Sequence, residues 1–467
     1  MRKPVRLACA RAIGGVRRRS GSWLAEAAAR FAQNRRGGVS TIVGLAIVPT
    51  VLGVGAAIDL GRVAAARSAL AMALDAAALA AARETDQSIA NLRNVAQRFL
   101  RANFAEESHG VLGPVEVSAS DLVLTVRARA EVPTTVMRIA GIATVEVTAE
   151  TEVTLSGVNL EVALVLDVTG SMAQGTKLAD LKAAAKDLLD ILLPDRASPF
   201  YSKVSLVPYS MGVNVGPVLA PLVRGPVSPG TCTTPGCQFY SFTNANGQGR
   251  THQISTCVSE RIGPHAYTDA PPTTAPVGRN YPATANPCLS SQLVPLSSGR
   301  TALKAAVDGL VASGSTAGHV GVAWGWYTLS PNFGLWTGGS IPAAYGRDDT
   351  RKFLVLMTDG EYNSSYCNGV ISRSSTSGSG SRSDQINCDA PNGHSFDQAR
   401  QLCTAIKARG IEIFTVGFQI VNDQRARDLM AQCASSPRHA YSAETGGELR
   451  AAFRQIASRM SKLRISR

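Results

Sequence analysis

The sequence lacks the motifs of the common zinc and catalytic sites. None of its nine cysteines forms a Cys-x-x-Cys pair and none of its six histidines forms a His-x₃₋₅-His pair, so a zinc site is not favoured. It also has no Gly-x-Ser-x-Gly elbow and no phosphate-binding P-loop. Because the usual signs of a hydrolase or a nucleotide-binding enzyme are missing, we expect that the protein is not an enzyme.

Charge is missing from one long stretch near the N-terminus. Residues 37–58 form a run of 22 residues without a charged side chain, long enough to cross a bilayer as a helix. Residues 1–36 hold ten Lys or Arg and one Glu, leaving 37 basic and 33 acidic residues for the rest of the chain. This asymmetry predicts a basic cytoplasmic tail, one transmembrane helix and an exported bulk. A cleaved signal peptide and a buried helix of a soluble protein are the alternatives.

The positive charge of the chain is concentrated in this tail. The formal net charge is +13, but the tail alone supplies +9 of it. A basic tail next to an apolar run is a topology signal, and it could also contact anionic lipid heads. We therefore expect no nucleic-acid partner.

Cysteine usage agrees with an exported bulk. Cys9 is alone in the tail, and eight cysteines follow the apolar run, an even number that predicts disulfides in an oxidising compartment. Eight cysteines allow about 105 pairings. Pairing of neighbours is our working hypothesis: Cys232 with Cys237, Cys257 with Cys288, Cys367 with Cys388, and Cys403 with Cys433.

The segment after the apolar run changes its periodicity. Residues 59–107 are rich in alanine and have few helix breakers, which predicts one long helix that continues from the membrane. Residues 111–155 contain three stretches that alternate apolar with polar, the pattern of half-buried strands. Residues 59–155 are therefore expected to pack a helix on a small antiparallel sheet, with VPTTVMRIAGI as a connection or short helix between the last two strands.

Oxygen-bearing side chains follow a buried strand later in the chain. The apolar run 162–166 ends at Asp167, and Thr169 and Ser171 follow at alternate positions. Ligands of open α/β sheets lie at the carboxyl ends of strands. One carboxylate and two hydroxyls are hard donors, which suit Mg²⁺ rather than a soft metal.

Two further segments complete a pattern. Residues 352–358 form a second apolar run that ends at Asp359, and Thr316 lies in a small-residue loop that opens a helix. Asp-x-Thr-x-Ser, a loop Thr and Thr-Asp-Gly resemble the metal-ion-dependent adhesion site of von Willebrand factor A domains, although that family usually has Ser where Thr169 stands. The resemblance implies Mg²⁺ or Mn²⁺ held directly by the hydroxyls of Thr169, Ser171 and Thr316. Asp167 and Asp359 would act mainly through bound waters, and an acidic side chain of a protein partner would fill the open position.

The rest of the chain fits such a domain. Strands and helices alternate over residues 159–466, which predicts a doubly wound, mostly parallel α/β sheet. Residues 216–299 and 361–393 are expected to be insertions, the first either a binding surface or a decorated loop and the second bordering the metal face. His319 is expected on a helix surface, and Trp324 and Trp326 in the core. Asp167-Val-Thr-Gly-Ser matches neither an aspartic protease, which needs Asp-Thr-Gly twice, nor a haloacid-dehalogenase-type phosphatase, which needs Asp at Thr169.

The N-terminal segment carries a second resemblance. The Arg-Arg-Gly lead, the proline-containing apolar run, the Asp-Leu-Gly-Arg exit and the Asp-Ala-Ala-Ala-Leu-Ala-Ala-Ala run of residues 35–83 resemble the TadE/TadG proteins of the tight-adherence (Flp) pilus machinery. With the adhesion-type domain, the chain is similar to the TadG branch. Cleavage after Gly38 would put Val43 where prepilins usually have Glu, so we expect no processing.

These resemblances imply a component of pilus assembly. The expected protein is anchored in the bacterial inner membrane, faces the periplasm, and contacts a protein partner and other assembly proteins. The alternative is a metal-dependent surface adhesin or receptor of the von Willebrand A type.

Overall fold

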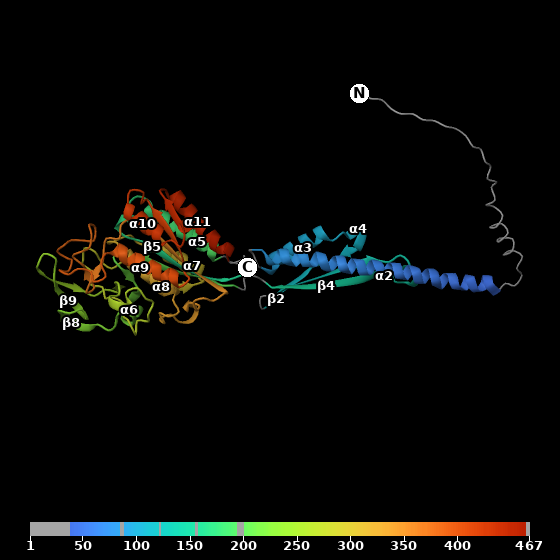
Figure 1. The fold of residues 1–467 in the computed structure, drawn as a ribbon, viewed down its shortest axis with the longest axis horizontal. Coiled ribbons are helices and arrows are strands. Elements are labelled where there is room, and N and C mark those ends of the chain that lie inside the picture. The colour runs from blue at the N-terminus through green and yellow to red at the C-terminus, as the bar shows by residue number, and fades with distance from the viewer. Residues whose placement is uncertain (1–37, 85–87, 121–122, 155–156, 194–199, 464–467) are drawn as a thin grey trace, which may run out of the picture. The chain divides into compact units, whose positions relative to one another are not determined.

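The computed structural model describes residues 38–84, 88–120, 123–154, 157–193 and 200–463 (Figure 1). The predicted basic tail and Cys9 lie outside the described residues. The chain forms two compact units. One comprises the described parts of residues 1–77, 97–116 and 126–151, and the other those of residues 78–96, 117–125 and 152–467.

A single long helix, α2 (Gly38–Ala82), begins the described chain. It contains the predicted apolar run, and every side chain described from position 39 to position 54 is exposed. In its most apolar window the mean hydropathy is 2.2, and only 6% of that window is buried. By length and composition, α2 is therefore a candidate membrane span. The helix continues through Pro49 without interruption.

The prediction of one helix over residues 59–107 is wrong in its second half. Helix α2 ends at Ala82, and a separate helix, α3 (Ile89–Asn103), follows, then the short α4 (Glu106–His109). The hydroxyl of Ser88 accepts a hydrogen bond from the Asn91 N–H at 3.4 Å, as a helix N-cap does. High helix propensity on both sides of residues 83–88 concealed this new start.

The predicted strands form a four-stranded sheet. Its strands are β1 (Val111–Leu112), β2 (Glu116–Ser120), β3 (Val123–Pro133) and β4 (Thr144–Thr154), with β3 between the others. Alternate side chains of β3 are buried, from Leu124 to Val132, so the period of two in the sequence marks the packed face. The connection between β3 and β4 contains the short 3₁₀ helix η1 (Met137–Ala140).

The larger unit is built on a six-stranded sheet. Its order is β12-β6-β5-β13-β16-β17, from β5 (Asn159–Asp167), β6 (Ser202–Tyr209), β12 (Val294–Ser297), β13 (Thr350–Thr358), β16 (Glu412–Phe418) and β17 (Ala440–Ala443). All neighbours pair in parallel except β12, which is antiparallel to β6 at the edge. The central strands are almost wholly buried, which explains their continuous apolar runs. The predicted doubly wound, mostly parallel fold is confirmed.

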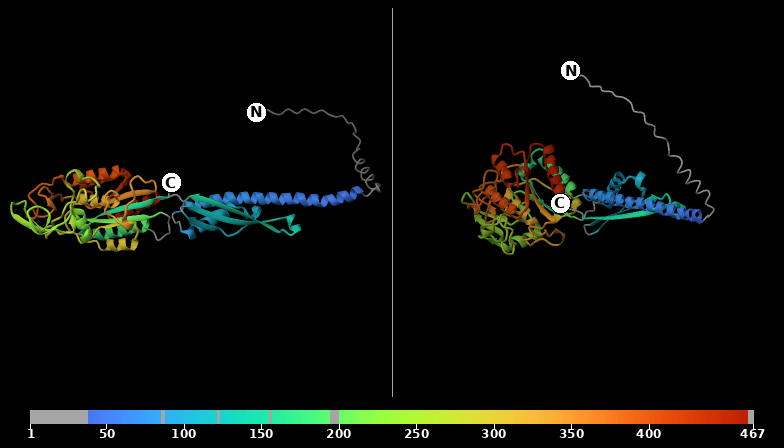
Figure 2. Two further views of the ribbon diagram at one scale, coloured as in Figure 1. Left: turned by 90° about the horizontal axis from the view of Figure 1, so that it is seen from below. Right: turned by 45° about the vertical axis from the view of Figure 1, so that its right-hand side comes forward.

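Helices cover both faces of this sheet (Figure 2). Helix α5 (Lys177–Leu192) packs against α7 (Arg300–Asp308) and α11 (Gly446–Leu463), and α9 (Ser395–Ala408) packs against α8 (Gly318–Leu329) and α10 (Gln424–Cys433). Every residue of α8 is buried. Trp324 and Trp326 are each 1% exposed and therefore lie in the core as predicted.

The first predicted insertion has more regular structure than its sequence suggests. It contains α6 (Gly216–Arg224), a small sheet of β8 (Ser228–Cys232), β9 (Cys237–Thr243) and β10 (Gly249–Gln253), and β11 (Cys257–Val258) paired with β7 (Val213–Asn214). Its last strand, β12, belongs to the main sheet. Strands this short, spaced by Gly and Pro, show no periodicity that sequence can reveal.

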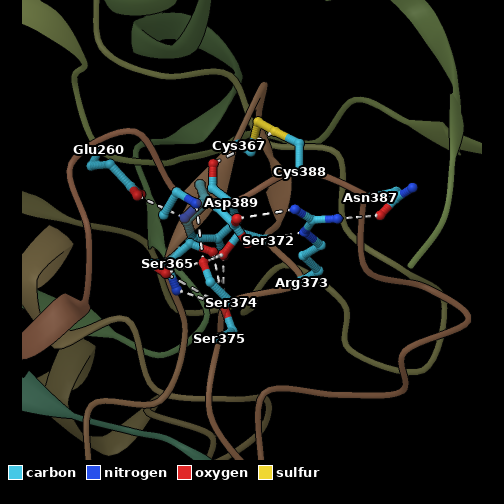
Figure 3. The surroundings of a disulfide bond; sticks show 12 residues. Glu260, Ser365, Cys367, Ser372, Arg373, Ser374, Ser375, Asn387, Cys388 and Asp389 are labelled. Atoms are coloured by element: carbon cyan, nitrogen blue, oxygen red, sulfur yellow. Dashed lines mark hydrogen bonds and ion pairs between the residues drawn. A yellow bond between two sulfur atoms is a disulfide. The ribbon is translucent and has the colours of Figure 1, made fainter. Parts of the chain in front are cut away.

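The four predicted disulfides are present with the pairing of neighbours: Cys232–Cys237, Cys257–Cys288, Cys367–Cys388 and Cys403–Cys433. The third one closes the second predicted insertion, which contains β14 (Tyr366–Cys367) and β15 (Val370–Ile371) (Figure 3). Beside it, Arg373 forms an ion pair with Asp389 at 3.0 Å and a hydrogen bond with Asn387 at 2.9 Å. This insertion is therefore an ordered part of the larger unit.

Candidate metal centre

The first candidate ligand, Asp167, is the last residue of β5. Parallel pairing sets β5 beside β6 and β13, so Asp167 lies level with Tyr209 and next to Thr358 at the carboxyl edge of the sheet. Its carboxylate accepts a hydrogen bond from the Thr358 hydroxyl at 2.8 Å and from the Tyr209 hydroxyl at 3.2 Å. The Thr169 N–H donates to its other oxygen at 2.9 Å. The strand register thus fixes this carboxylate where open α/β sheets bind ligands.

The loop after β5 brings three more candidates together. The hydroxyls of Thr169 and Ser171 lie 2.9 Å apart, and the Ser171 hydroxyl donates to Asp359 at 2.6 Å. Asp359 follows β13 directly, so two strands that are far apart in sequence supply one cluster of oxygen atoms. Asp167, Thr169 and Asp359 are buried, whereas Ser171 is partly exposed.

The loop that carries Thr316 is tied to the same edge. The Gly170 N–H donates to the Gly314 carbonyl at 2.8 Å, and the Ser313 N–H donates to the Val168 carbonyl at 2.9 Å. Gly314 has a φ of +81°, a conformation that glycine adopts without strain. Thr316 itself is held from the other side, because its N–H donates to the Asn363 side chain at 2.9 Å.

Both insertions support this loop. Asn286, from the first insertion, accepts a hydrogen bond from the Ser315 N–H at 3.0 Å and donates one to the Ser315 hydroxyl at 2.8 Å. Asn363 comes from the second insertion and contacts Thr316. The segments that the sequence marks as additions to the fold therefore border the candidate metal centre.

The charges of the cluster are not balanced. Lys177, the first residue of α5, places its ammonium 2.8 Å from Asp359, and two buried carboxylates thus face one cation. Burial and the nearby charge of Asp359 raise the pKa of Asp167 to about 6. Oxygen donors with a surplus of negative charge fit a hard divalent cation, so the residues present are compatible with Mg²⁺ or Mn²⁺.

Two residues of the centre were not identified from the sequence. Lys177 and Tyr209 contact the candidate ligands but lie outside the Asp-x-Thr-x-Ser and Thr-Asp-Gly motifs. The sequence signal that could have identified Tyr209 is its position at the end of a strand adjacent to β5. Burial, with the charge of Asp167 nearby, raises the pKa of Tyr209 well above its usual value, so its hydroxyl remains a donor.

The prediction that His319 lies on a helix surface is wrong. Its side chain is fully buried, and its Nε2 atom lies 3.3 Å from the carboxylate of Glu260. The other oxygen of Glu260 accepts a hydrogen bond from the Tyr366 N–H at 2.7 Å. This contact links helix α8 to both insertions. The sequence did not indicate the contact, because His319 lies on a glycine-rich helix whose pattern does not show which residues it meets.

Comparisons with known proteins identify a family match for the N-terminal segment. Residues 37–84 match the family described as "Putative Flp pilus-assembly TadE/G-like". A comparison with curated proteins found no match. The doubly wound, mostly parallel sheet expected for the larger unit, with candidate ligands at its carboxyl edge, is found.

Three of the solved structures to which this chain is similar have low sequence identity to it. The vWF domain of the type V pili tip protein Mfa5 from Porphyromonas gingivalis is 12% identical, with a TM-score of 0.39 and coverage of 67% of this chain and 97% of that chain. The pilus adhesin SpaC from Lactobacillus rhamnosus GG is 15% identical, with a TM-score of 0.34 and coverage of 74% and 34%. A von Willebrand factor type A protein from Catenulispora acidiphila is 14% identical, with a TM-score of 0.29 and coverage of 75% and 50%. The chain thus spans about a third of the length of the adhesin.

Proposed function

We propose that this chain, whose residues 37–84 are TadE/G-like, is a membrane-anchored component of Tad/Flp pilus assembly that recognises a protein partner through a divalent cation. Residues 37–58 would cross the inner membrane with the N-terminus in the cytoplasm, and the rest would face the periplasm. The family match carries this proposal, and the four disulfides are compatible with an oxidising compartment.

The proposed role of the metal centre is recognition. The hydroxyls of Thr169, Ser171 and Thr316 would hold Mg²⁺ or Mn²⁺, and Asp167 and Asp359 would neutralise part of its charge. A bound divalent cation with an open position attracts a carboxylate, so the partner chemistry that fits is an exposed Asp or Glu side chain. We assign binding rather than catalysis to this centre.

The test of this function is pilus formation in the bacterium that makes the protein. Ser171→Ala removes one hydroxyl of the cluster, and Ser381→Ala, at an exposed serine of the second insertion, is the matched control. With equal protein levels, we expect Flp pili to be lost in the first variant and retained in the second, as counted by electron microscopy. Normal piliation in a Ser171→Ala strain whose protein no longer binds metal would contradict the proposal.

A metal-dependent surface adhesin is the second candidate. The observation that favours it is that both insertions border the metal centre and could form a ligand-binding rim. Protease treatment of intact cells separates the two functions. Cleavage of the larger unit in intact cells would place it on the surface and favour the adhesin, whereas cleavage only after the outer membrane is opened would favour assembly.

A further inference from the structure

The connection between β3 and β4 exposes large apolar side chains. Ile139 is 76% exposed and Ile142 is 44% exposed, and Arg138 next to them is also exposed. The hydroxyl of Thr134 donates to the Ala143 carbonyl at 3.1 Å, so the two ends of the connection are held together. We call residues 134–143 the apolar loop.

The apolar loop is fastened to helix α2 at a buried carboxylate. Asp59, only 1% exposed, accepts hydrogen bonds from the backbone N–H groups of Thr135 at 3.0 Å, Val136 at 2.7 Å and Met137 at 2.8 Å. The guanidinium of Arg62 donates to the Thr135 hydroxyl at 3.0 Å. Asp59 and Arg62 are the charged residues of the Asp-Leu-Gly-Arg motif, so this motif holds the loop in place.

The loop also reaches past Asp59 toward the N-terminus of the helix. A Cβ atom added at Gly55 would lie 2.5 Å from a methyl group of Val136, so the loop covers α2 at this glycine. Gly55 is buried, whereas the side chains described at positions 39–54 are all exposed. It precedes Asp59 by one turn, about 6 Å along the helix. The apolar loop therefore overlaps the last turn of the apolar run 37–58.

We infer that the apolar loop docks on the phospholipid surface from which α2 emerges. This inference rests on the proposed membrane anchor: if residues 37–58 fill the bilayer, a loop that covers Gly55 lies at its outer face. Ile139 and Ile142 then enter the boundary between headgroups and acyl chains, and Arg138 lies among the lipid phosphates. The motif Asp59–Arg62 thus sets the height of the small sheet above the membrane.

The experiment places a lipid-sensitive probe on the full chain in phosphatidylethanolamine–phosphatidylglycerol vesicles. Cys9→Ser removes the one cysteine outside the four disulfides, and a fluorophore is attached through Ile139→Cys or Ile142→Cys. Ile47→Cys, within the apolar run, is the control for the anchor. Glu150→Cys, on β4 about 20 Å along the strand from its first residue, is the control for water. Quenching by nitroxide-labelled lipids is measured for each.

We expect strong quenching at Ile47, clear quenching at Ile139 and Ile142, and none at Glu150. Quenching at Ile47 without quenching at the loop would overturn the inference and leave the anchor intact. Absence of quenching at all four positions would overturn the anchor as well. A blue-shifted probe at Ile139 without lipid quenching would mean that a protein surface covers the loop, which also overturns the inference.

A second variant tests the fastening. Asp59→Ala removes the acceptor of three backbone hydrogen bonds, and Asp75→Ala, at an exposed position of the same helix, is the matched control. We expect quenching at Ile139 to decrease with Asp59→Ala and not with Asp75→Ala, while quenching at Ile47 stays constant. Equal quenching at Ile139 in both variants would show that Asp59 does not position the loop.

Discussion

At the scale of single residues, the affinity of the metal centre for a cation depends on the groups that contact its two buried carboxylates. Lys177 forms an ion pair with Asp359, and hydroxyl groups surround Asp167. A cation that enters this cluster must compete with the ammonium of Lys177 for Asp359. The lysine therefore stabilises the metal-free protein and weakens the binding of the metal.

Replacing Lys177 tests this competition. Lys177→Met removes the ammonium and keeps the aliphatic part of the side chain, so Mn²⁺ should bind more tightly. If the binding free energy becomes more favourable by about 1.4 kcal/mol, the affinity increases about tenfold. The thermal midpoint in chelator should fall, because Asp359 loses its ion pair. Isothermal titration calorimetry measures the affinity. Lys182→Met, at a half-buried lysine of the same helix whose ammonium donates to the Asp308 carbonyl rather than to the cluster, should leave the Mn²⁺ affinity unchanged, and weaker binding by Lys177→Met would contradict the account.

The raised pKa of Asp167 predicts a pH dependence of stability. The folded-state pKa of about 6 lies above that of an unfolded aspartate, about 4, so the folded protein binds more protons between these values. Without metal, the contribution of Asp167 to the unfolding free energy should decrease as the pH rises from about 4 to about 6, by roughly 3 kcal/mol, and stay constant above. Denaturant titrations in chelator, followed by tryptophan fluorescence, measure it.

The matched variant isolates this residue. Asp167→Asn cannot lose a proton, so the difference in unfolding free energy between wild type and variant should depend on pH only in that window. Mn²⁺ should bind the wild type less tightly at pH 5 than at pH 7, because protonation of Asp167 opposes cation binding. A constant difference between wild type and Asp167→Asn from pH 4 to pH 7 would show that the carboxyl is not perturbed.

At the scale of elements, helix α8 shows how small residues bring a helix onto the sheet. A Cβ atom added at Gly325 would lie 2.5 Å from Val165 and 2.9 Å from Leu354, both on central strands. The glycine at this position of the helix is therefore a packing requirement. Because Thr316 lies two residues before α8, the position of this helix on the sheet also positions the Thr316 loop.

Enlarging this glycine should loosen the contact. Gly325→Ala inserts a methyl group into a filled core, which commonly costs about 1–3 kcal/mol. Gly339→Ala, where a Cβ atom would meet nothing within 4 Å, should be close to neutral. Denaturant titration of both variants measures the difference. Equal stability of the two would mean that α8 can shift away from β5 without loss.

Elements also show where sequence reasoning succeeds. Apolar strands followed by Asp167 and Asp359 were recognisable because buried parallel strands are continuous apolar runs, and alternation marked β3. The break after Ala82 was not recognised, because helix propensity is high on both sides. The contact between His319 and Glu260 was also missed, since it joins residues from distant segments. Lys177 could not be assigned to Asp359 for the same reason.

At the scale of the whole molecule, one chain combines a segment that matches a TadE/G-like family model with a doubly wound α/β unit. Residues 37–84 match the TadE/G-like family, and the larger unit brings the candidate metal ligands to one edge of its sheet. The positions of Asp167 and Asp359 at this edge were predictable, because each ends or follows an apolar run that forms a buried strand. The sequence could not show which residues of the insertions support the Thr316 loop, because the insertions have no periodicity from which their folding can be predicted.

The most direct measurement is the thermal midpoint of the full chain in detergent, followed by tryptophan fluorescence, in Mn²⁺ and in chelator. A cation that binds only the folded state stabilises it by about 2.7 kcal/mol at a concentration of 100 Kd. The account predicts a higher midpoint in Mn²⁺ for the wild type and for Ser381→Ala, and no increase for Ser171→Ala. An unchanged midpoint of the wild type at millimolar Mn²⁺ would contradict the metal centre.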